Sequence, residues 1–276
     1  MGIFAWQSDP GVEKNDGSKV VEVPSLAQRE SLLCEGETSD RSLAERHDLF
    51  RYNASMIQAR DLQYQYHDGS FRLRIPDWHV ARGSRVLVVG PSGCGKTTLL
   101  GLLAGLLPVG GGELHIGGRK MEQLGDTERR MMRISTVGQV FQELELVEYL
   151  TVRENILLPY FINRQFQLTA EAERRAEELA QQAHIDSHLD RPVGRLSHGE
   201  RQRVAACRAM VVKPGLILAD EPTANLDSVA GNRLLEMFFA CCQQTGATLV
   251  MVSHYKSLAD GFDELLDLSS LLECEE

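Results

Sequence analysis

A glycine-rich segment near the middle of the chain has the residue types and spacing of a phosphate-binding loop. Residues 90–97 fit the pattern G-x-x-x-x-G-K-[ST], with an apolar run before them and an apolar helical pattern after them. Glycines let the backbone curl so that its N–H groups point at phosphate oxygens. We expect Lys96 to reach the β- and γ-phosphates, Thr97 to place its hydroxyl on Mg²⁺, and Thr98 to assist at the α-phosphate. The expected nucleotide contacts are Gly90, Pro91, Ser92, Gly93, Cys94, Gly95, Lys96, Thr97 and Thr98.

An acidic pair closes a second apolar run. Asp220 and Glu221 follow "LILA" at 216–219, and the carboxyl ends of strands are where open α/β sheets bind ligands. Asp220 suits a carboxylate that organises Mg²⁺, and Glu221 suits a general base that orients an attacking water. The alternative is that both acids merely cap the next turn. The phosphate loop in the same chain favours the catalytic interpretation.

The elements that must position these residues follow from the hydrophobic pattern. Alternation predicts two strands joined by a turn at Asp68-Gly69, and continuous apolar runs predict strands that are buried on both faces. The predicted strands are 55–67, 71–80, 84–90, 215–220 and 248–254, with a further turn–strand–turn at 110–119. The predicted helices are Lys96 to Leu107, a helix that starts after Ser197, and 228–246 ending at Gly246, with 151–195 mainly helical. This alternation indicates one α/β nucleotide-type domain with a mostly parallel sheet.

Composition narrows the class of protein. The 276 residues carry a net charge of −10, which argues against broad nucleic-acid binding. No run of 18 apolar residues predicts a membrane span, and the first 16 residues lack the pattern of a signal peptide. The six cysteines show no metal-binding spacing and predict reduced thiols. Residues 1–54 are expected to form an extension that is disordered or loosely docked, ahead of a domain at 55–276.

Further motifs follow in a fixed order along the chain. Tyr66 precedes the phosphate loop, and Gln142 lies in "VFQELELVEYLTVREN". Leu196-Ser197-His198-Gly199-Glu200 opens a helix, Ala224-Asn225-Leu226-Asp227 follows the acidic pair, and His254 ends "VMVSH". Over residues 55–265 this ordered set resembles the ATP-binding cassette (ABC) ATPases.

The resemblance implies an α/β P-loop NTPase of the ABC ATPase type. Its parts would be a RecA-like core, an antiparallel β subdomain and a helical subdomain at about 143–195. Tyr66 would stack on adenine, with Tyr64 as the alternative. Gln142 would contact Mg²⁺ and assist catalysis, and His254 would bond the γ-phosphate of ATP.

The resemblance also implies a homodimer on ATP binding. In the family, two domains associate head to tail, so that Ser197, His198, Gly199 and Asp227 would approach the nucleotide held by the opposite subunit. A helix N-terminus suits this contact because its free N–H groups point outward. His198 departs from the family's usual glycine. We expect a working loop with altered affinity or pH dependence; the rival is a weakened site.

The segment 112–160 and "LSHGERQRVA" are similar to the lipoprotein-release, macrolide-export and cell-division subunits of the family. That resemblance implies a separate integral-membrane permease, whose coupling helix would dock at about 142–165. The chain would then be cytoplasmic, peripheral on the inner face of the cell membrane. Two alternatives remain: a soluble ABC ATPase acting in repair or on ribosomes, and an ATP-dependent assembly module that is not coupled to transport.

Overall fold

The computed structural model describes residues 55–67, 69, 71–163 and 165–270. The predicted extension at 1–54 and Asp68 of the predicted turn lie outside the described residues. Among the helices of the described part, none combines the length and the apolar character that crossing a membrane requires.

An antiparallel sheet forms one layer of the domain. Its strands run in the order β2-β1-β4-β5, with β1 at Ser55–Gln65, β2 at Arg72–Ala81, β4 at Gly111–Ile116 and β5 at Arg119–Lys120. The buried residues of β2 are Leu73, Ile75, Trp78 and Val80, which alternate with exposed residues except at the exposed pair Pro76 and Asp77. One face of this sheet therefore packs on the core, as its alternating sequence predicts.

A parallel sheet lies beneath it and contains the strands that lead to the predicted motifs. The order is β6-β7-β8-β3-β9, and every pair is parallel. The strands are β3 at Arg85–Val89, β6 at Val137–Val140, β7 at Leu216–Asp220, β8 at Thr248–Val252 and β9 at Glu264–Asp267. All residues of β7 and β8 are buried, which explains their continuous apolar sequence.

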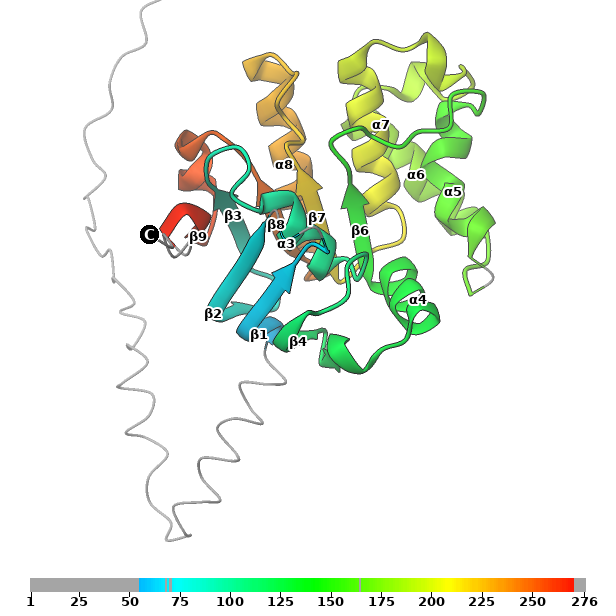
Figure 1. Cartoon of the computed structure of the whole chain (residues 1–276). Coiled ribbons are helices and arrows are strands. Elements are labelled where there is room, and N and C mark those ends of the chain that lie inside the picture. The colour runs from blue at the N-terminus through cyan, green and yellow to red at the C-terminus, as the bar shows by residue number, and fades with distance from the viewer. Residues whose placement is uncertain (1–54, 68, 70, 164, 271–276) are drawn as a thin grey trace, which may run out of the picture. The chain divides into compact units, whose positions relative to one another are not determined.

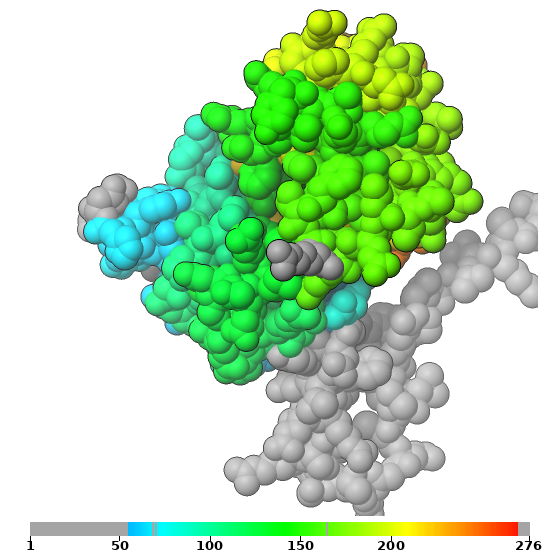
Figure 2. Space-filling model, turned by 90° about the vertical axis from the view of Figure 1, so that its right-hand side faces the viewer, coloured from blue at the N-terminus to red at the C-terminus, as the bar shows by residue number. Residues whose placement is uncertain are grey.

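Six helices complete the described fold (Figure 1). They are α3 at Lys96–Leu103, α4 at Asp126–Thr136, α5 at Val152–Ile162, α6 at Ala170–Gln182, α7 at His198–Met210 and α8 at Ser228–Thr245. Helices α5, α6 and α7 gather beyond the β6 edge of the sheet, and α5 and α6 lie in the region 143–195 predicted to be helical. Figure 2 shows this helical face, in green and yellow-green.

Helix α3 is shorter than predicted. It ends at Leu103 and not at Leu107, because the Leu106 and Leu107 N–H groups both bond to the Gly101 carbonyl, at 2.8 and 3.1 Å. Gly105 supplies the left-handed turn, with φ of 64°. The apolar residues beyond Leu103 belong to this turn. Helix α8 ends as predicted at Gly246, which also adopts a left-handed conformation.

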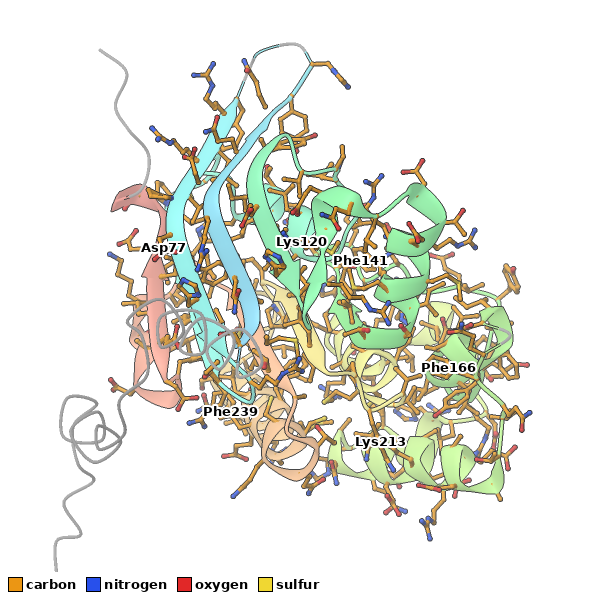
Figure 3. All side chains as sticks on the ribbon, turned by 90° about the horizontal axis from the view of Figure 1, so that it is seen from below. Asp77, Lys120, Phe141, Phe166, Lys213 and Phe239 are labelled. Carbon is orange, nitrogen blue, oxygen red and sulfur yellow. The ribbon has the colours of Figure 1, made fainter. Side chains whose placement is uncertain are left out.

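The two faces of the parallel sheet bury different cores. Val86, Leu218 and Val250 pack toward α3 and the antiparallel sheet, whereas Leu87, Ile217, Leu249 and their neighbours pack against α6, α7 and α8. Seen from below, the strand that carries Asp77 lies at the left and the segment that carries Phe166 lies at the right (Figure 3). The candidate site lies at the carboxyl ends of the parallel strands.

Candidate functional site

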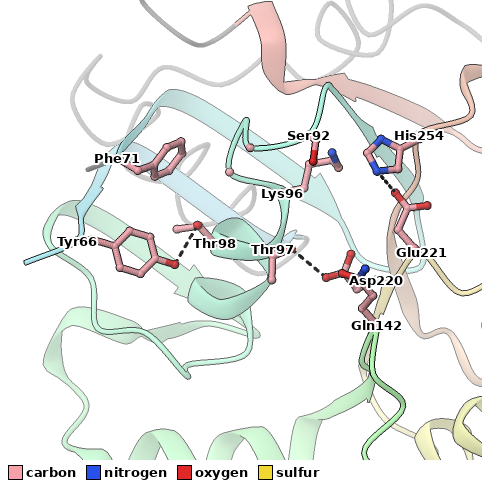
Figure 4. A pocket seen from close by; sticks show the side chains of 12 residues that line it. Tyr66, Phe71, Ser92, Lys96, Thr97, Thr98, Gln142, Asp220, Glu221 and His254 are labelled. Atoms are coloured by element: carbon pink, nitrogen blue, oxygen red, sulfur yellow. Dashed lines mark hydrogen bonds and ion pairs between the residues drawn. The ribbon is translucent and has the colours of Figure 1, made fainter. Parts of the chain in front are cut away.

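The predicted motifs converge at the carboxyl ends of four neighbouring strands. β3 leads into the phosphate loop, β6 into Gln142, β7 ends in Asp220, and β8 is followed by Ser253 and His254. A cavity of about 460 Å³ opens there (Figure 4). It is lined by Tyr66, Phe71, Ser92, Gly93, Gly95, Lys96, Thr97, Thr98, Gln142, Asp220, Glu221 and His254.

The phosphate loop wraps around the start of α3. Gly95 caps the helix with φ of 96°, and a Cβ at this position would lie 2.6 Å from the ring of Phe71. Only glycine satisfies both the backbone angle and the close approach. The Lys96 ammonium lies 2.9 Å from the Gly90 and Pro91 carbonyl oxygens and is nearly buried. It is thus fixed at the mouth of the loop, where a phosphate oxygen would meet it.

Thr97 and Asp220 bring two side-chain oxygen atoms together in the cavity, and both could be ligands of a metal ion. The Thr97 hydroxyl donates to Asp220 Oδ2 at 3.1 Å. Asp220 is only 7% exposed, and burial raises the pKa of its carboxyl, while the bond from Thr97 and the charge of Lys96 act against that rise. Oxygen donors of this kind suit a hard divalent cation.

Glu221 is held in an unusual backbone conformation. Its φ of 49° is in the left-handed region, which costs a non-glycine residue of order 1–3 kcal/mol. The surroundings fix it: the Glu221 N–H donates to the Val252 carbonyl at 3.1 Å, and its carbonyl accepts from Ala224 N at 3.1 Å and Gln202 Nε2 at 3.4 Å. The side chain is therefore directed by β8 and by α7.

The Glu221 carboxylate meets His254 across the cavity. Oε1 lies 3.1 Å from His254 Nε2, with the glutamate side chain 9% exposed and the imidazole 50% exposed. Burial raises the pKa of Glu221, and the nearby histidine lowers it. A largely buried carboxylate beside an imidazole can orient a water and accept its proton.

Two aromatic rings stand at the other end of the cavity. The Tyr66 hydroxyl is 3.3 Å from Thr98 Oγ1, and the Tyr66 and Phe71 ring centroids are 6.4 Å apart. Tyr64 does not line this cavity, although its ring packs edge-on against Tyr66 at 5.1 Å. Of the two tyrosines, Tyr66 is therefore the one that the cavity presents to a ligand. Phe71 is a cavity residue that the motifs did not identify. The predicted hairpin could have indicated it, because that turn brings Phe71 opposite Tyr66, whose N–H donates to the Phe71 carbonyl.

Gln142 precedes a strained loop. Leu144 and Glu145 both have positive φ, of 62° and 47°. Arg208, near the end of α7, clamps them: its Nη2 donates to the Leu144 carbonyl at 2.6 Å, and its Nη1 donates to the Glu145 carbonyl. A helix remote in sequence thus fixes the segment that follows Gln142.

Seven predicted site residues do not line this cavity: Gly90, Pro91 and Cys94 of the phosphate loop, and four residues at the starts of α7 and α8. Ser197 caps the start of α7, His198 and Gly199 begin that helix, and Asp227 caps α8 by accepting from Ala230 N at 2.9 Å. The His198 Nε2 lies 3.1 Å from Asn225 Nδ2, so the two loops touch within one chain. The cavity residues and the α7 loop are therefore separate surfaces of one subunit.

The described cysteines are unpaired thiols. Cys94, Cys207, Cys241 and Cys242 are all free and buried. Burial raises the pKa of Cys207 and of Cys242 to about 12. A raised pKa leaves less of the reactive thiolate at neutral pH, so Cys207 and Cys242 are poor nucleophiles.

The chain is similar to known proteins over most of its length. The family model described as ABC transporter matches residues 73–224. The lipoprotein-releasing system ATP-binding protein LolD of Xanthomonas campestris pv. campestris (strain 8004) is 37% identical over 218 residues, which cover 78% of this chain and 90% of the relative.

Solved structures agree with this relationship. The dimeric structure of MJ0796, a bacterial ABC transporter cassette, shares 30% identity and a TM-score of 0.69, covering 77% of this chain and 95% of that one. A post-hydrolysis dimer of the same cassette, bound to ADP and Pi, shares 29% identity and a TM-score of 0.69, covering 77% and 94%. The match spans both sheets and the helical region that surround the cavity.

Proposed function

The chain belongs to the ABC transporter family as an ATP-binding and ATP-hydrolysing cassette, and from that premise we propose that it powers a separate membrane permease as a head-to-tail homodimer. The observation that carries the site assignment is the convergence of Lys96, Thr97, Asp220, Glu221 and His254 on one cavity. A cassette that acts apart from any transporter is not favoured, because the curated relative is named for a lipoprotein-releasing system.

The proposed catalytic roles follow from the contacts. Tyr66 stacks on adenine, and the phosphate loop with Lys96 holds the β- and γ-phosphates. Glu221 orients the attacking water and accepts its proton, since its carboxylate is directed into the cavity by the backbone bonds to Val252 and Gln202. His254 lies beside Glu221 and donates to the γ-phosphate.

The residues present fit Mg²⁺. Thr97 and Asp220 place two oxygens 3.1 Å apart beside the phosphate loop, and Gln142 lines the same cavity. These three side chains would hold the ion, which when bound supplies charge neutralisation to the phosphate oxygens.

Dimerisation is supported by the position of the α7 loop. Ser197, His198 and Gly199 have the helix N-terminus that suits phosphate, yet they do not line the cavity of their own subunit. A second copy placed head to tail would bring them to the nucleotide. The related cassette MJ0796 has a dimeric structure.

The proposed permease contact is an apolar groove beside β6. It has a volume of about 250 Å³ and runs between α4, β6, α5 and α7. Its apolar lining includes Ile134, Val137, Phe141, Leu158, Pro159, Ile162 and Val212. Phe141 directly precedes Gln142, so a permease helix in this groove would press on the loop that reaches the nucleotide. With this contact we infer a position at the inner face of the membrane, and the name of the curated relative suggests lipoprotein release as the class of transport.

The test is the ATP response of the full chain carrying Glu221→Gln. We expect hydrolysis to fall by about 100-fold or more, because the base is lost, while ATP binding persists. The closed state should then accumulate, so light scattering after size exclusion should show a dimer with Mg·ATP and a monomer without it. Hydrolysis at the normal rate would remove Glu221 from the mechanism. A persistent monomer would argue against the composite site.

A further inference from the structure

The serine at the start of α7 is held by a carboxylate of its own helix. Ser197 N and Ser197 Oγ both donate to Glu200 Oε2 at 2.8 Å, and the Glu200 N–H donates back to Ser197 Oγ at 3.3 Å. The hydroxyl proton is therefore committed to Glu200. To donate to a phosphate oxygen, Ser197 must release this bond.

A second capping box in the chain shows what capping alone requires. Thr151 and Glu154 make the same three bonds at the start of α5, at 2.8, 2.9 and 3.2 Å. The Glu154 side chain lies at the exposed surface of its helix. The Glu200 box differs from it, because its second carboxylate oxygen meets a histidine.

That histidine is His188, in the 3-10 turn Asp186–His188 ahead of α7. His188 Nε2 lies 3.0 Å from Glu200 Oε1, and the Ser187 hydroxyl lies 3.3 Å from His188 Nδ1. The two side chains are only 19% and 25% exposed. The bonds from Ser197, with a smaller effect of His188, lower the pKa of Glu200, so this carboxylate stays ionised beside the serine.

An ionised glutamate at this position opposes the proposed function of the loop. Glu200 holds a negative charge next to the hydroxyl and the N–H groups that are to meet a triphosphate, and like charges at this separation repel. We propose that His188 is a positioning residue that offsets the charge of Glu200, and so lets the Ser197 hydroxyl turn from Glu200 to a phosphate oxygen of the nucleotide held by the second subunit. This proposal rests on the head-to-tail dimer proposed above.

Other charged groups surround the pair. Asp186, Asp190 and Arg191 flank His188 in the chain, and Asp190 lies 3.7 Å from Arg153 Nε of α5. From α7, Glu200 makes the contact with His188, and Arg201 follows it in sequence. An imidazole gains a proton more readily at pH 6 than at pH 8, whereas carboxylates and guanidinium groups keep their charge over this range.

The experiment measures the ATP concentration that gives half-maximal dimerisation. The full chain carrying Glu221→Gln is the parent, and Mg·ATP is titrated at pH 6 and pH 8 with light scattering as the readout. We expect His188→Ala to raise the required ATP by about threefold to fivefold at pH 6, with a smaller change at pH 8, as for a partly exposed ion pair. The chain has other histidines, His198 and His254 among them, so the comparison is between variants at each pH.

Two further variants separate charge from structure. His188→Gln keeps an N–H for Glu200 but cannot gain a proton, so it should match the parent at pH 8 and behave like His188→Ala at pH 6. In a Glu200→Gln background, His188→Ala should have no effect, because the charge to be offset is gone. His184→Ala, an exposed histidine four residues away, is the matched control and should leave both titrations unchanged.

The outcomes are distinguishable. A parent that does not dimerise at any ATP concentration would overturn the proposed dimer, and this proposal with it. A parent that dimerises, with His188→Ala equal to it at both pH values, would overturn the role of His188 alone. So would an effect of His188→Ala that persists in the Glu200→Gln background.

Discussion

Asp220 is a buried carboxylate in the candidate site, and its burial has a cost in stability. Burial raises its pKa above the ordinary 3.8, so the folded chain binds this proton more readily than the unfolded chain does. The protonated Asp220 carboxyl therefore increases the free energy of unfolding at low pH, and this contribution disappears as the pH rises through the raised pKa. At neutral pH the ionised, buried carboxylate is a net cost to stability.

Replacing Asp220 should expose this cost. Asp220→Asn keeps an oxygen that accepts from Thr97 but removes the buried charge. Without nucleotide and with a chelator present, we expect the melting temperature at pH 7.5 to rise by about 2–4 °C, and the gain to shrink as the pH approaches 4. Hydrolysis should fall by about 100-fold or more. A variant less stable than the parent at pH 7.5 would contradict the assigned cost.

The adenine contact gives a second prediction at the level of single residues. Tyr66→Ala should raise the KM for ATP by about 5- to 100-fold, the range of a lost stacking contact, whereas Tyr66→Phe should change it little. Tyr64→Ala is the matched control, because Tyr64 packs on Tyr66 without lining the cavity. If Tyr64→Ala raised the KM for ATP more than Tyr66→Ala did, in steady-state ATP hydrolysis, Tyr64 and not Tyr66 would be the ring that stacks on adenine.

Single residues of the site could be predicted where their chemical role requires one type of residue at a fixed distance in the sequence from the others. Lys96, Thr97, Asp220 and Glu221 are of this kind. The supporting residues were not predictable, because Phe71, Gln202 and Arg208 act through contacts between segments distant in the sequence. An arginine in a helix becomes a loop clamp only when the fold brings the Leu144 carbonyl to it.

Helix α7 connects three parts of the site. Its first turn holds Ser197, its middle reaches the Glu221 carbonyl through the buried Gln202, and its last turn clamps Leu144 and Glu145 through Arg208. A shift of this helix would therefore move the catalytic backbone and the Gln142 loop together.

The clamp can be tested by Arg208→Lys. Lysine keeps the charge but lacks the planar fork that reaches two carbonyls at once. We expect the free energy of unfolding to fall by about 1–3 kcal/mol, with a lower kcat, because the strained Leu144 and Glu145 lose their support. Arg174→Lys is the control: its side chain is 70% exposed in an i,i+4 pair, and it should change stability by less than about 0.5 kcal/mol. Equal denaturation curves for the two variants would show that Arg208 does not stabilise the loop at Leu144 and Glu145.

At the level of elements, the sequence predicted those helices and strands whose own residues show a clear hydrophobic pattern or a terminating glycine. The continuous apolar runs predicted β3, β7 and β8, and Gly246 marked the end of α8. Helix α4 and strands β5, β6 and β9 were not predicted. Met132 is the only buried residue of α4. Strand β6 is four residues with a glycine and a glutamine, and it becomes a strand through its pairing with β7. Strands this short depend on their neighbours, so their own sequences do not identify them.

The whole molecule presents its two proposed partner surfaces on different elements. The α7 loop is proposed to face a second copy, and the groove beside β6 to face the permease. Ile162, 62% exposed at the end of α5, lines that groove, whereas Leu265, 51% exposed, lies on β9 at the opposite edge of the parallel sheet. The two positions match in type and exposure and differ in place, so they can separate the groove from a general surface effect.

A charge placed in the groove should separate transport from ATP chemistry. Ile162→Asp should leave ATP-driven dimerisation and basal hydrolysis of the purified chain within about twofold, because it touches neither surface of the nucleotide site. In cells it should lower the fraction of the chain that sediments with membranes by about tenfold, since burying an unpaired carboxylate in an apolar contact is costly. Leu265→Asp should leave that fraction unchanged. Equal loss from both variants, or no loss from Ile162→Asp, would place the permease contact elsewhere on the molecule.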